Sequence, residues 1–543
     1  MCSNVFNKLR TVSLGGYLLN VMTERVRFWE TVYHLVKKEG MRLIQMNENE
    51  DIVWLEDERK EPYHIIRMAR KNYDWANHLK HDVDRISRSA NALRRELKLR
   101  QANITNVIFS KYTPIDDYSS LVSQPLPLTG GGKKQFRTII LSLPDLEEQF
   151  FPLATEWQLN ETPQYMPEPQ VEFEEVENEL IRALQLQVKQ SMQERQRKDQ
   201  ELFTYGRPRF TGFLIGIILA VFLMIEMQAD TESPLTLIEY GAKFNPLIIE
   251  GEWWRFFSAM FLHIGLLHLM MNSLALFYLG GAVERIFGTK RFIFIYFLAG
   301  FTGSVASFVF NDNISAGASG AIFGCFGALL YFGLIYKRLF FRTMGMSLIV
   351  ILAINLVFGF VVPMVDNGAH VGGLLGGFAA ALITGLPKHK DRIYQRTAMI
   401  ATAGMLLVLL WAGYDQEMDT TQLSSIYFQV GADWVEREDE EAARPYFRWV
   451  VDQNEEEVPE EIYTNALFML AYVEIQFDRL DEAEFYLEET IEREEDFHEA
   501  FYNLALILHE QGRDDEAVTY IEEALEHEPD NSDYQELQQE IEQ

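Results

Sequence analysis

The sequence predicts a multi-domain membrane protein with three parts: a soluble N-terminal α+β domain, a polytopic α-helical membrane domain and a C-terminal all-α domain of helical repeats. Three observations lead to this prediction. Seven apolar stretches follow one another in mid-chain, a 34-residue pattern recurs near the end, and strand-like runs alternate with helical runs at the start. With 543 residues, about three domains are expected. We place them at 1–168, 207–414 and 415–543, with a linker helix at 169–206.

Residues 1–168 have the mixed pattern of a small α+β domain. A helix near 26–38 precedes the strand-like runs RLIQM, DIVWL and HIIRMA. A long helix near 73–99 follows, and then the runs NVIFS and RTIIL. Proline-rich ETPQYMPEPQ marks a linker, and the helix after it, at about 171–201, is expected to lead into the first apolar stretch.

The long helix of this domain raises the question of a metal site. Asp74, His78 and Asp82 lie on one helix face, at i, i+4 and i+8, with His81 beside them. Carboxylates and imidazoles on one face could hold a divalent metal. A solvated polar face is the favoured interpretation, so we predict neither a metal nor any other cofactor.

The seven apolar stretches of the middle region predict membrane-spanning helices. Each has roughly 17–25 residues, the length that crosses about 30 Å of hydrocarbon as a helix. A buried helix of a soluble protein can look similar once, but not seven times in succession. The expected spans are 210–227, 258–283, 292–310, 315–336, 344–362, 368–386 and 398–414.

Charge in the connecting segments predicts the orientation of the spans. Basic residues gather before span one and after spans two, four and six, whereas the alternate loops are mainly acidic. The positive-inside rule then places the N-terminus in the cytoplasm and the C-terminus outside. The basic residues concerned are Arg207, Arg209, Lys290, Arg291, Lys337, Arg338, Arg342, Lys388, Lys390, Arg392 and Arg396.

The overall negative charge belongs to the C-terminal domain. Residues 414–543 carry 40 acidic and 6 basic side chains, whereas the rest of the chain is nearly balanced. Nucleic acid is therefore disfavoured as a partner. The only cysteines are Cys2 and Cys325, and Cys325 lies in an apolar span, so no disulfide framework is expected.

Polar residues inside the predicted spans point to a function, because such groups are costly in hydrocarbon. His268 and Asn272 share one helix face in span two, and His263 is expected on the same helix, nearer its outer end. Ser319 lies among small residues at the start of span four, and His370 lies at the start of span six. The predicted orientation brings His268, Ser319 and His370 to a similar depth near the outer surface.

These residues suit acyl transfer. An imidazole can take the proton of a serine hydroxyl and make it a nucleophile, which gives Ser319 and His370 complementary roles. The oxyanion that forms needs hydrogen-bond donors, and His268, Asn272 and the Ser319 backbone N–H are candidates. Glycines at four-residue spacing, Gly320 and Gly324 in span four and Gly373 and Gly377 in span six, predict close approach of the two helices.

Each residue also has a structural interpretation. A serine in a membrane helix usually bonds a carbonyl of the previous turn, and a histidine near a helix end often bridges two helices. The residues that other kinds of intramembrane protease need are absent from the sequence. The chain has neither an H-E-x-x-H zinc motif nor paired aspartates within the spans.

Together, these motifs resemble the rhomboid intramembrane serine proteases over about residues 208–414. The matching motifs are Trp254-Arg255, H-x-x-x-N at His268–Asn272, Gly281-Ala282-Val283-Glu284-Arg285, G-x-S-G at Gly317–Gly320, and Ala369-His370 followed by Gly373 and Gly377. The whole layout looks like the GluP-type rhomboids of Gram-positive bacteria, and this resemblance implies a multi-pass protein of the bacterial cell membrane.

The resemblance assigns expected roles. It implies Ser319 as nucleophile, His370 as base, and His268 and Asn272 as oxyanion partners, with His263 lining the water-accessible cavity. Phe323 stands where some relatives have a tyrosine that stacks on the base. The implied fold has six core helices plus one trailing span, and the implied substrates are membrane proteins cleaved in or near a transmembrane helix.

The 34-residue pattern of the tail is the tetratricopeptide period. DEAEFYLEETI at Asp481–Ile491 aligns with DEAVTYIEEAL at Asp515–Leu525, and a looser copy covers about 423–454. Such helix pairs stack into a concave surface that binds peptides. Recruitment of a protein partner or substrate is favoured over a purely stabilising cap.

The sequence therefore predicts an intramembrane serine endopeptidase that acts on membrane-protein substrates within the lipid bilayer. The alternative is a catalytically silent membrane adaptor that binds and routes membrane proteins, which the presence of both Ser319 and His370 disfavours. A transporter would need a continuous polar path, and spans three, five and seven supply no charged residues for one.

Overall fold

The computed structural model describes residues 24–59, 63–96, 102–128, 135–165, 174–362, 365–387, 389 and 391–542. The chain divides into two compact units, Met1–Leu202 and Phe203–Gln543. Each unit is described by itself below. Cys2 and Lys388 and Lys390, named above, lie outside the described residues.

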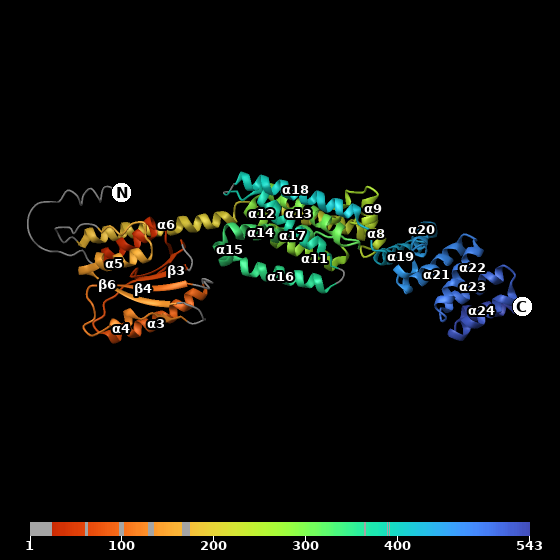
Figure 1. Cartoon of the computed structure of the whole chain (residues 1–543), viewed down its shortest axis with the longest axis horizontal. Helices are drawn as coiled ribbons and strands as arrows, with labels where there is room; N and C mark the ends of the chain where they lie inside the picture. The colour runs from red at the N-terminus through yellow and green to blue at the C-terminus, as the bar shows by residue number, and fades with distance from the viewer. Residues whose placement is uncertain are drawn as a thin grey trace, which may run out of the picture. The chain divides into compact units, whose positions relative to one another are not determined.

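The first unit is built on one mixed sheet, as predicted for an α+β domain (Figure 1). The strand order is β1-β2-β3-β4-β6-β5. β3, β4 and β6 run parallel, and the other pairs are antiparallel. The strands are β1 (Arg42–Met46), β2 (Ile52–Asp57), β3 (Tyr63–Arg70), β4 (Ala102–Ser110), β5 (Leu126–Pro127) and β6 (Gln135–Ser142).

Helices cover both faces of this sheet. α2 (Glu24–Tyr33), α5 (Leu146–Glu156) and α6 (Glu174–Phe203) pack on one face, and α3 (Ala76–Glu96) and α4 (Ser119–Ser123) pack on the other. The predicted linker helix is α6. It is not a free connector, because Leu180, Leu184 and Val188 are buried in the core of the unit.

The two carboxylates that could have held a metal have other partners, and Asp74 precedes α3. Asp82 accepts hydrogen bonds from Lys71 Nζ at 3.1 Å and from Tyr73 and Arg85, and Asp74 accepts one from the Tyr112 hydroxyl at 2.7 Å. No group of three or more His, Cys, Asp or Glu side chains in the described part of the chain could hold a metal ion.

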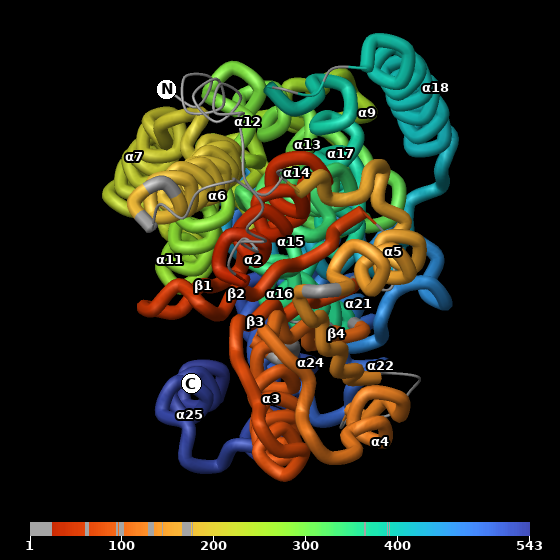
Figure 2. The backbone as a smooth tube through the Cα atoms, turned by 90° about the vertical axis from the view of Figure 1, so that its left-hand side faces the viewer, coloured from red at the N-terminus to blue at the C-terminus, as the bar shows by residue number. Residues whose placement is uncertain are grey.

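The second unit begins with the helical membrane domain. Seven helical segments lie where the apolar stretches predict them: α7 (Arg209–Glu226), α11–η4–α12 (Gly265–Phe287), α13 (Thr289–Phe310), α14 (Ser319–Ile335), α16 (Gly345–Val361), α17 (Asn367–Thr384) and α18 (Arg392–Asp415). α17 packs most extensively against α13 and α14. α18 lies at the edge of the bundle (Figure 2).

Length and hydropathy set four of these seven segments apart from the other three. α7, α11–α12, α13 and α18 are each long and apolar enough to span a membrane among the described residues. α16 reaches this threshold only together with α15 (Lys337–Thr343), from which it is bent by 75°. α14 is shorter and almost entirely buried by its neighbours, so protein rather than lipid surrounds it.

The connection between α7 and α11 folds over one end of the bundle. It contains α8 (Pro234–Glu239), α9 (Asn245–Ile249) and α10 (Arg255–Ser258). α10 continues as a short 3₁₀ turn, and the next helix starts only at Gly265, whose φ of 67° interrupts the chain direction. Span two was predicted to begin at Ser258, so its helix starts one and a half to two turns later than expected.

The tail forms helix pairs, and the buried alanines of the last two complete pairs keep the predicted 34-residue spacing. Its helices are α19 (Thr420–Glu436), α20 (Glu440–Val451), α21 (Glu460–Gln476), α22 (Leu480–Arg493), α23 (His498–Glu510), α24 (Asp514–His527) and α25 (Ser532–Ile541). The aligned alanines Ala471, Ala505, Ala483 and Ala517 are all fully buried. Small residues at these positions let neighbouring helices approach closely.

The first repeat helix, α19, packs on the connection between α7 and α11. Leu423, Ile426 and Val430 share an apolar cluster with Leu235 and Phe244. Polar contacts surround this cluster. Ser233 Oγ donates to Asp433 at 2.7 Å, and Arg437 donates to Glu239 and to Thr236 at 3.0 Å.

Candidate active site

Ser319 is the first residue of α14 and follows a sharp turn at Gly317. Gly317 has a φ of 139°, which favours glycine, and its N–H donates to the Ala259 carbonyl at 2.9 Å. The N–H groups at the start of a helix lack intrahelical acceptors. Ser319 therefore offers a hydroxyl and an amide donor at the same point.

His370 lies in the first turn of α17, and a cap fixes the start of that helix. The Asp366 carboxylate accepts a hydrogen bond from Ala369 N at 2.8 Å. His370 Nε2 is 2.9 Å from Ser319 Oγ. Phe323, one turn after Ser319, stacks on the imidazole with ring centroids 4.1 Å apart and planes 14° apart. The structure thus brings Ser319, His370 and Phe323 together.

Glycines set the distance between the two helices that carry this pair. A Cβ on Gly373 would collide with the backbone of Gly320, and a Cβ on Gly377 would collide with the backbone of Gly324. α14 and α17 therefore touch backbone to backbone, as small residues allow in membrane helices. Side chains at these positions would push the serine and the histidine apart.

His268 and Asn272 project from α11 towards the turn before Ser319. A Cβ on Gly317 would lie 2.8 Å from His268 Cε1 and 3.9 Å from Asn272 Nδ2. In this structure Asn272 Nδ2 donates to the His268 carbonyl at 3.1 Å. Three separate helices thus contribute side chains around one turn.

The Ser319–His370 pair has no third member in the described part of the chain. The buried Nδ1 of His370 makes no hydrogen bond there, and no carboxylate orients the imidazole. Stacking by Phe323 orients the ring instead. A serine and an imidazole arranged in this way can carry out acyl transfer, because paired nucleophiles and bases exist without a carboxylate.

Comparisons with known proteins identify the family. A rhomboid domain model matches residues 250–387, a tetratricopeptide repeat model matches 474–541, and a model of anaphase-promoting complex subunit 5 matches 438–496. Rhomboid protease GluP of Bacillus subtilis (strain 168) is 35% identical over 486 residues, covering 87% of this chain and 89% of the relative. The chain belongs to the rhomboid family of intramembrane serine proteases.

Other rhomboids match about a third of this chain. RHOMBOID-like protein 5 of Arabidopsis thaliana is 34% identical over 36% of this chain and 71% of its own length. RHOMBOID-like protein 6, mitochondrial, of the same plant is 42% identical over 34% of this chain and 62% of its own length. The likeness to GluP extends further, into both flanking regions.

His263 is placed differently from the prediction. It was expected on the helix of span two, but it lies in the non-helical segment before Gly265. Its ring centroid is 5.2 Å from that of His268, and its Nε2 accepts a hydrogen bond from Ala318 N at 3.4 Å. His263 therefore braces the turn before Ser319 from outside the helix.

Two further motif residues of the rhomboid have structural partners. Arg255 donates to the carbonyls of Ile238 at 2.7 Å and Ala242 at 3.0 Å. The buried carboxylate of Glu284 accepts hydrogen bonds from Phe210 N, Thr211 N and the hydroxyls of Thr211 and Thr289 at 2.7–3.0 Å. These contacts give both residues a structural role.

Two polar residues near the pair were not predicted. Asp366 caps the helix of His370, and Lys243 is buried behind the segment that leads to Ser319. An aspartate three residues before Ala369 is a typical capping pattern. Lys243 is a basic residue in a connection that is mainly acidic. This exception to the charge pattern is a signal by which the sequence could have revealed it.

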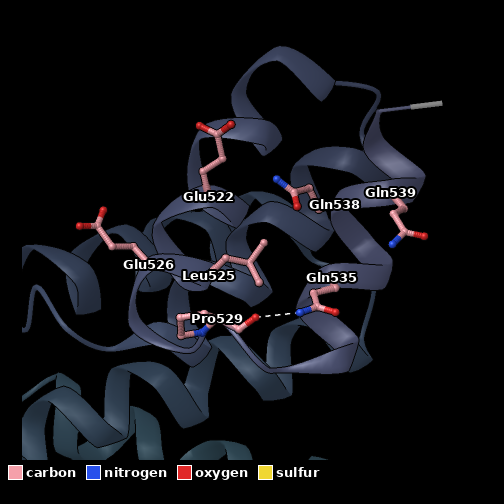
Figure 3. A pocket seen from close by; sticks show the side chains of 7 residues that line it. All are labelled: Glu522, Leu525, Glu526, Pro529, Gln535, Gln538 and Gln539. Atoms are coloured by element: carbon pink, nitrogen blue, oxygen red, sulfur yellow. Dashed lines mark hydrogen bonds between the residues drawn. The ribbon is translucent and has the colours of Figure 1, made fainter.

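A shallow hollow lies far from this site, at the end of the repeats (Figure 3). It lies between α24 and α25, and Gln535 Nε2 donates across it to the Pro529 carbonyl at 2.8 Å. Acidic, amide and apolar side chains line it: Glu522, Leu525, Glu526, Pro529, Gln535, Gln538 and Gln539. It contains none of the predicted catalytic residues.

Proposed function

We propose that this rhomboid cleaves transmembrane segments of membrane proteins with a catalytic dyad formed by Ser319 and His370. The observation that carries the proposal is the 2.9 Å contact between Ser319 Oγ and His370 Nε2, made by residues of two different membrane helices. Neither a metal nor a cofactor enters the reaction.

The geometry suggests a sequence of proton transfers. His370 Nε2 accepts the hydroxyl proton as Ser319 Oγ attacks the scissile carbonyl carbon. The tetrahedral intermediate collapses, the C–N bond breaks, and the imidazolium returns the proton to the leaving amine. Water then gives a proton to His370 and attacks the carbonyl carbon of the acyl ester. The C–Oγ bond breaks, the acid is released, and the imidazolium returns its proton to Ser319 Oγ.

The oxyanion is stabilised by donors around Gly317. His268, Asn272 and the Ser319 N–H border this turn. The Asn272 amide donates to the His268 carbonyl in the free enzyme, so it must reorient or share its second hydrogen when the oxyanion forms. His263 holds the Ala318 end of the same turn.

The two flanking regions bear on how substrates reach the enzyme. The charge pattern places the N-terminal unit in the cytoplasm and the repeats outside the cell. Tetratricopeptide domains mediate protein interactions, and in this enzyme the repeats recruit membrane-protein substrates or their partners. Substrate helices must unwind at the cleaved bond, so small or helix-breaking residues are expected there.

Covalent labelling tests the proposal directly. A fluorophosphonate should react with the purified enzyme in detergent or in vesicles, because the dyad activates one hydroxyl above all others. Peptide mass spectrometry should find the phosphonyl group on Ser319. Labelling elsewhere, or none in a folded enzyme that also cleaves no transmembrane substrate, would instead support the silent-adaptor alternative.

The Asn272→Ala enzyme tests the oxyanion assignment. Loss of one oxyanion donor should reduce kcat by roughly 10²- to 10³-fold. KM should change little, because the donor acts mainly on the charge that develops in the transition state. Cleavage of a fluorescent transmembrane substrate in vesicles measures both constants, and an unchanged kcat would remove Asn272 from the oxyanion site.

A further inference from the structure

A buried lysine lies behind the active-site turn and has no part in the proposed chemistry. Lys243, between α8 and α9, is 1% exposed. Its ammonium donates to two backbone carbonyls, those of Asn311 and, at 3.1 Å, Asn313. Lysines are almost never fully buried without partners, because desolvating the charge is costly.

The backbone of Lys243 holds the same segment a second time. Lys243 N donates to the Ser315 carbonyl at 2.9 Å, and Ser315 N donates to the Lys243 carbonyl at 3.0 Å. Side chain and backbone together thus make four hydrogen bonds to 311–315. This segment joins the end of α13 to the turn at Gly317, and therefore leads directly to Ser319.

Two carboxylates act on the charge of Lys243. Burial lowers the pKa of Lys243 to about 8, and the carboxylates of Asp366 and Asp312 limit this decrease. The ammonium is thus mainly protonated at pH 7. Asp366 caps α17, and its carbonyl accepts a hydrogen bond from His370 N at 3.1 Å.

We propose that Lys243 is a positioning residue that holds the segment before Ser319 in place, so that the dyad stays aligned. The proposal rests on the assignment of Ser319 and His370 as the dyad. Lys243 acts through this segment and does not touch the substrate.

A rate measurement separates positioning from simple stabilisation. A residue that only stabilises the fold changes the fraction of enzyme that can be labelled by fluorophosphonate. A positioning residue changes the rate constant of labelling in the folded fraction. The comparison uses the full-length wild type, Lys243→Met, the smaller polar replacement Lys243→Gln, and Lys290→Met, which removes an exposed lysine from α13.

We expect Lys243→Met to reduce the labelling rate constant by about 10²-fold, a typical effect of displacing reactive groups by about 1 Å. Lys243→Gln, which keeps one donor group, should fall between it and the wild type. Lys290→Met should match the wild type. The KM of Lys243→Met for a transmembrane substrate should stay within about twofold of the wild-type value. The substitution disturbs the dyad and leaves the contacts with the substrate unchanged.

Several outcomes would overturn the proposal. A wild-type rate constant in either folded Lys243 variant would do so, and so would unfolding of both variants, which would assign Lys243 to the fold alone. A wild type that is labelled on a residue other than Ser319 would be a failure of the dyad assignment itself, and is distinguishable from failure of the Lys243 proposal.

Discussion

Replacing Ser319 with alanine is expected to reduce cleavage of a transmembrane substrate by about 10⁵-fold or more. The hydroxyl that would form the acyl ester is absent, so only binding and oxyanion stabilisation remain. His370→Ala should cause a loss of similar size, because no other described group accepts a hydrogen bond from Ser319 Oγ. Single-turnover cleavage in vesicles, followed by gel densitometry, measures these rates.

Comparison of single and double variants makes this result more specific. Two residues that act as one unit have strongly non-additive effects. The Ser319→Ala/His370→Ala enzyme should therefore be no slower than either single variant. Ser347→Ala, which changes an exposed serine of α16, serves as the matched control and should retain full activity. Equal cleavage by the wild type and Ser319→Ala would exclude Ser319 as the nucleophile.

Replacing Gly377 with valine is expected to prevent correct packing of the membrane domain. The new Cβ would collide with the Gly324 backbone, and a backbone cannot move aside as a flexible side chain can. Overpacking of this kind costs about 3 kcal/mol or more. The variant should lose both thermal stability and fluorophosphonate labelling, because α14 and α17 separate and carry Ser319 and His370 apart.

A second glycine provides the control for this prediction. Gly404, in α18, has no atom within 4 Å of an added Cβ. Gly404→Val should therefore melt close to the wild type in a detergent thermal-shift assay. A Gly377→Val enzyme with normal melting temperature and labelling rate would mean that the glycine contact does not determine the dyad distance.

The sequence predicts most of the fold, because its signals are local. Hydropathy locates the membrane helices, and a 34-residue period locates the repeats. Prediction from the sequence fails where a glycine with positive φ interrupts an apolar stretch. Gly265 delays the helix of span two, and His263 therefore lies outside it. Hydropathy cannot detect this, since the residues on both sides remain apolar.

Each predicted dyad residue could be found because it lies in a short motif of its own: G-x-S-G contains Ser319, and Ala369-His370 contains the histidine. Lys243 could not be assigned a role in this way. Its side-chain acceptors are backbone carbonyls 68 and 70 residues later in the chain, and any residue type supplies a carbonyl. The sheet order was also beyond local signals, because the parallel pairing of β3 with β4 and of β4 with β6 depends on where the intervening chain crosses.

The packing of α19 has a practical consequence for shortening the chain. Hydropathy suggests a cut after Tyr414, where the last apolar stretch ends. Such a cut would uncover Leu235 and Phe244, which α19 shields from water. A truncated enzyme would then expose these apolar side chains to water and would tend to self-associate. Retaining residues to the end of α19 keeps that surface covered.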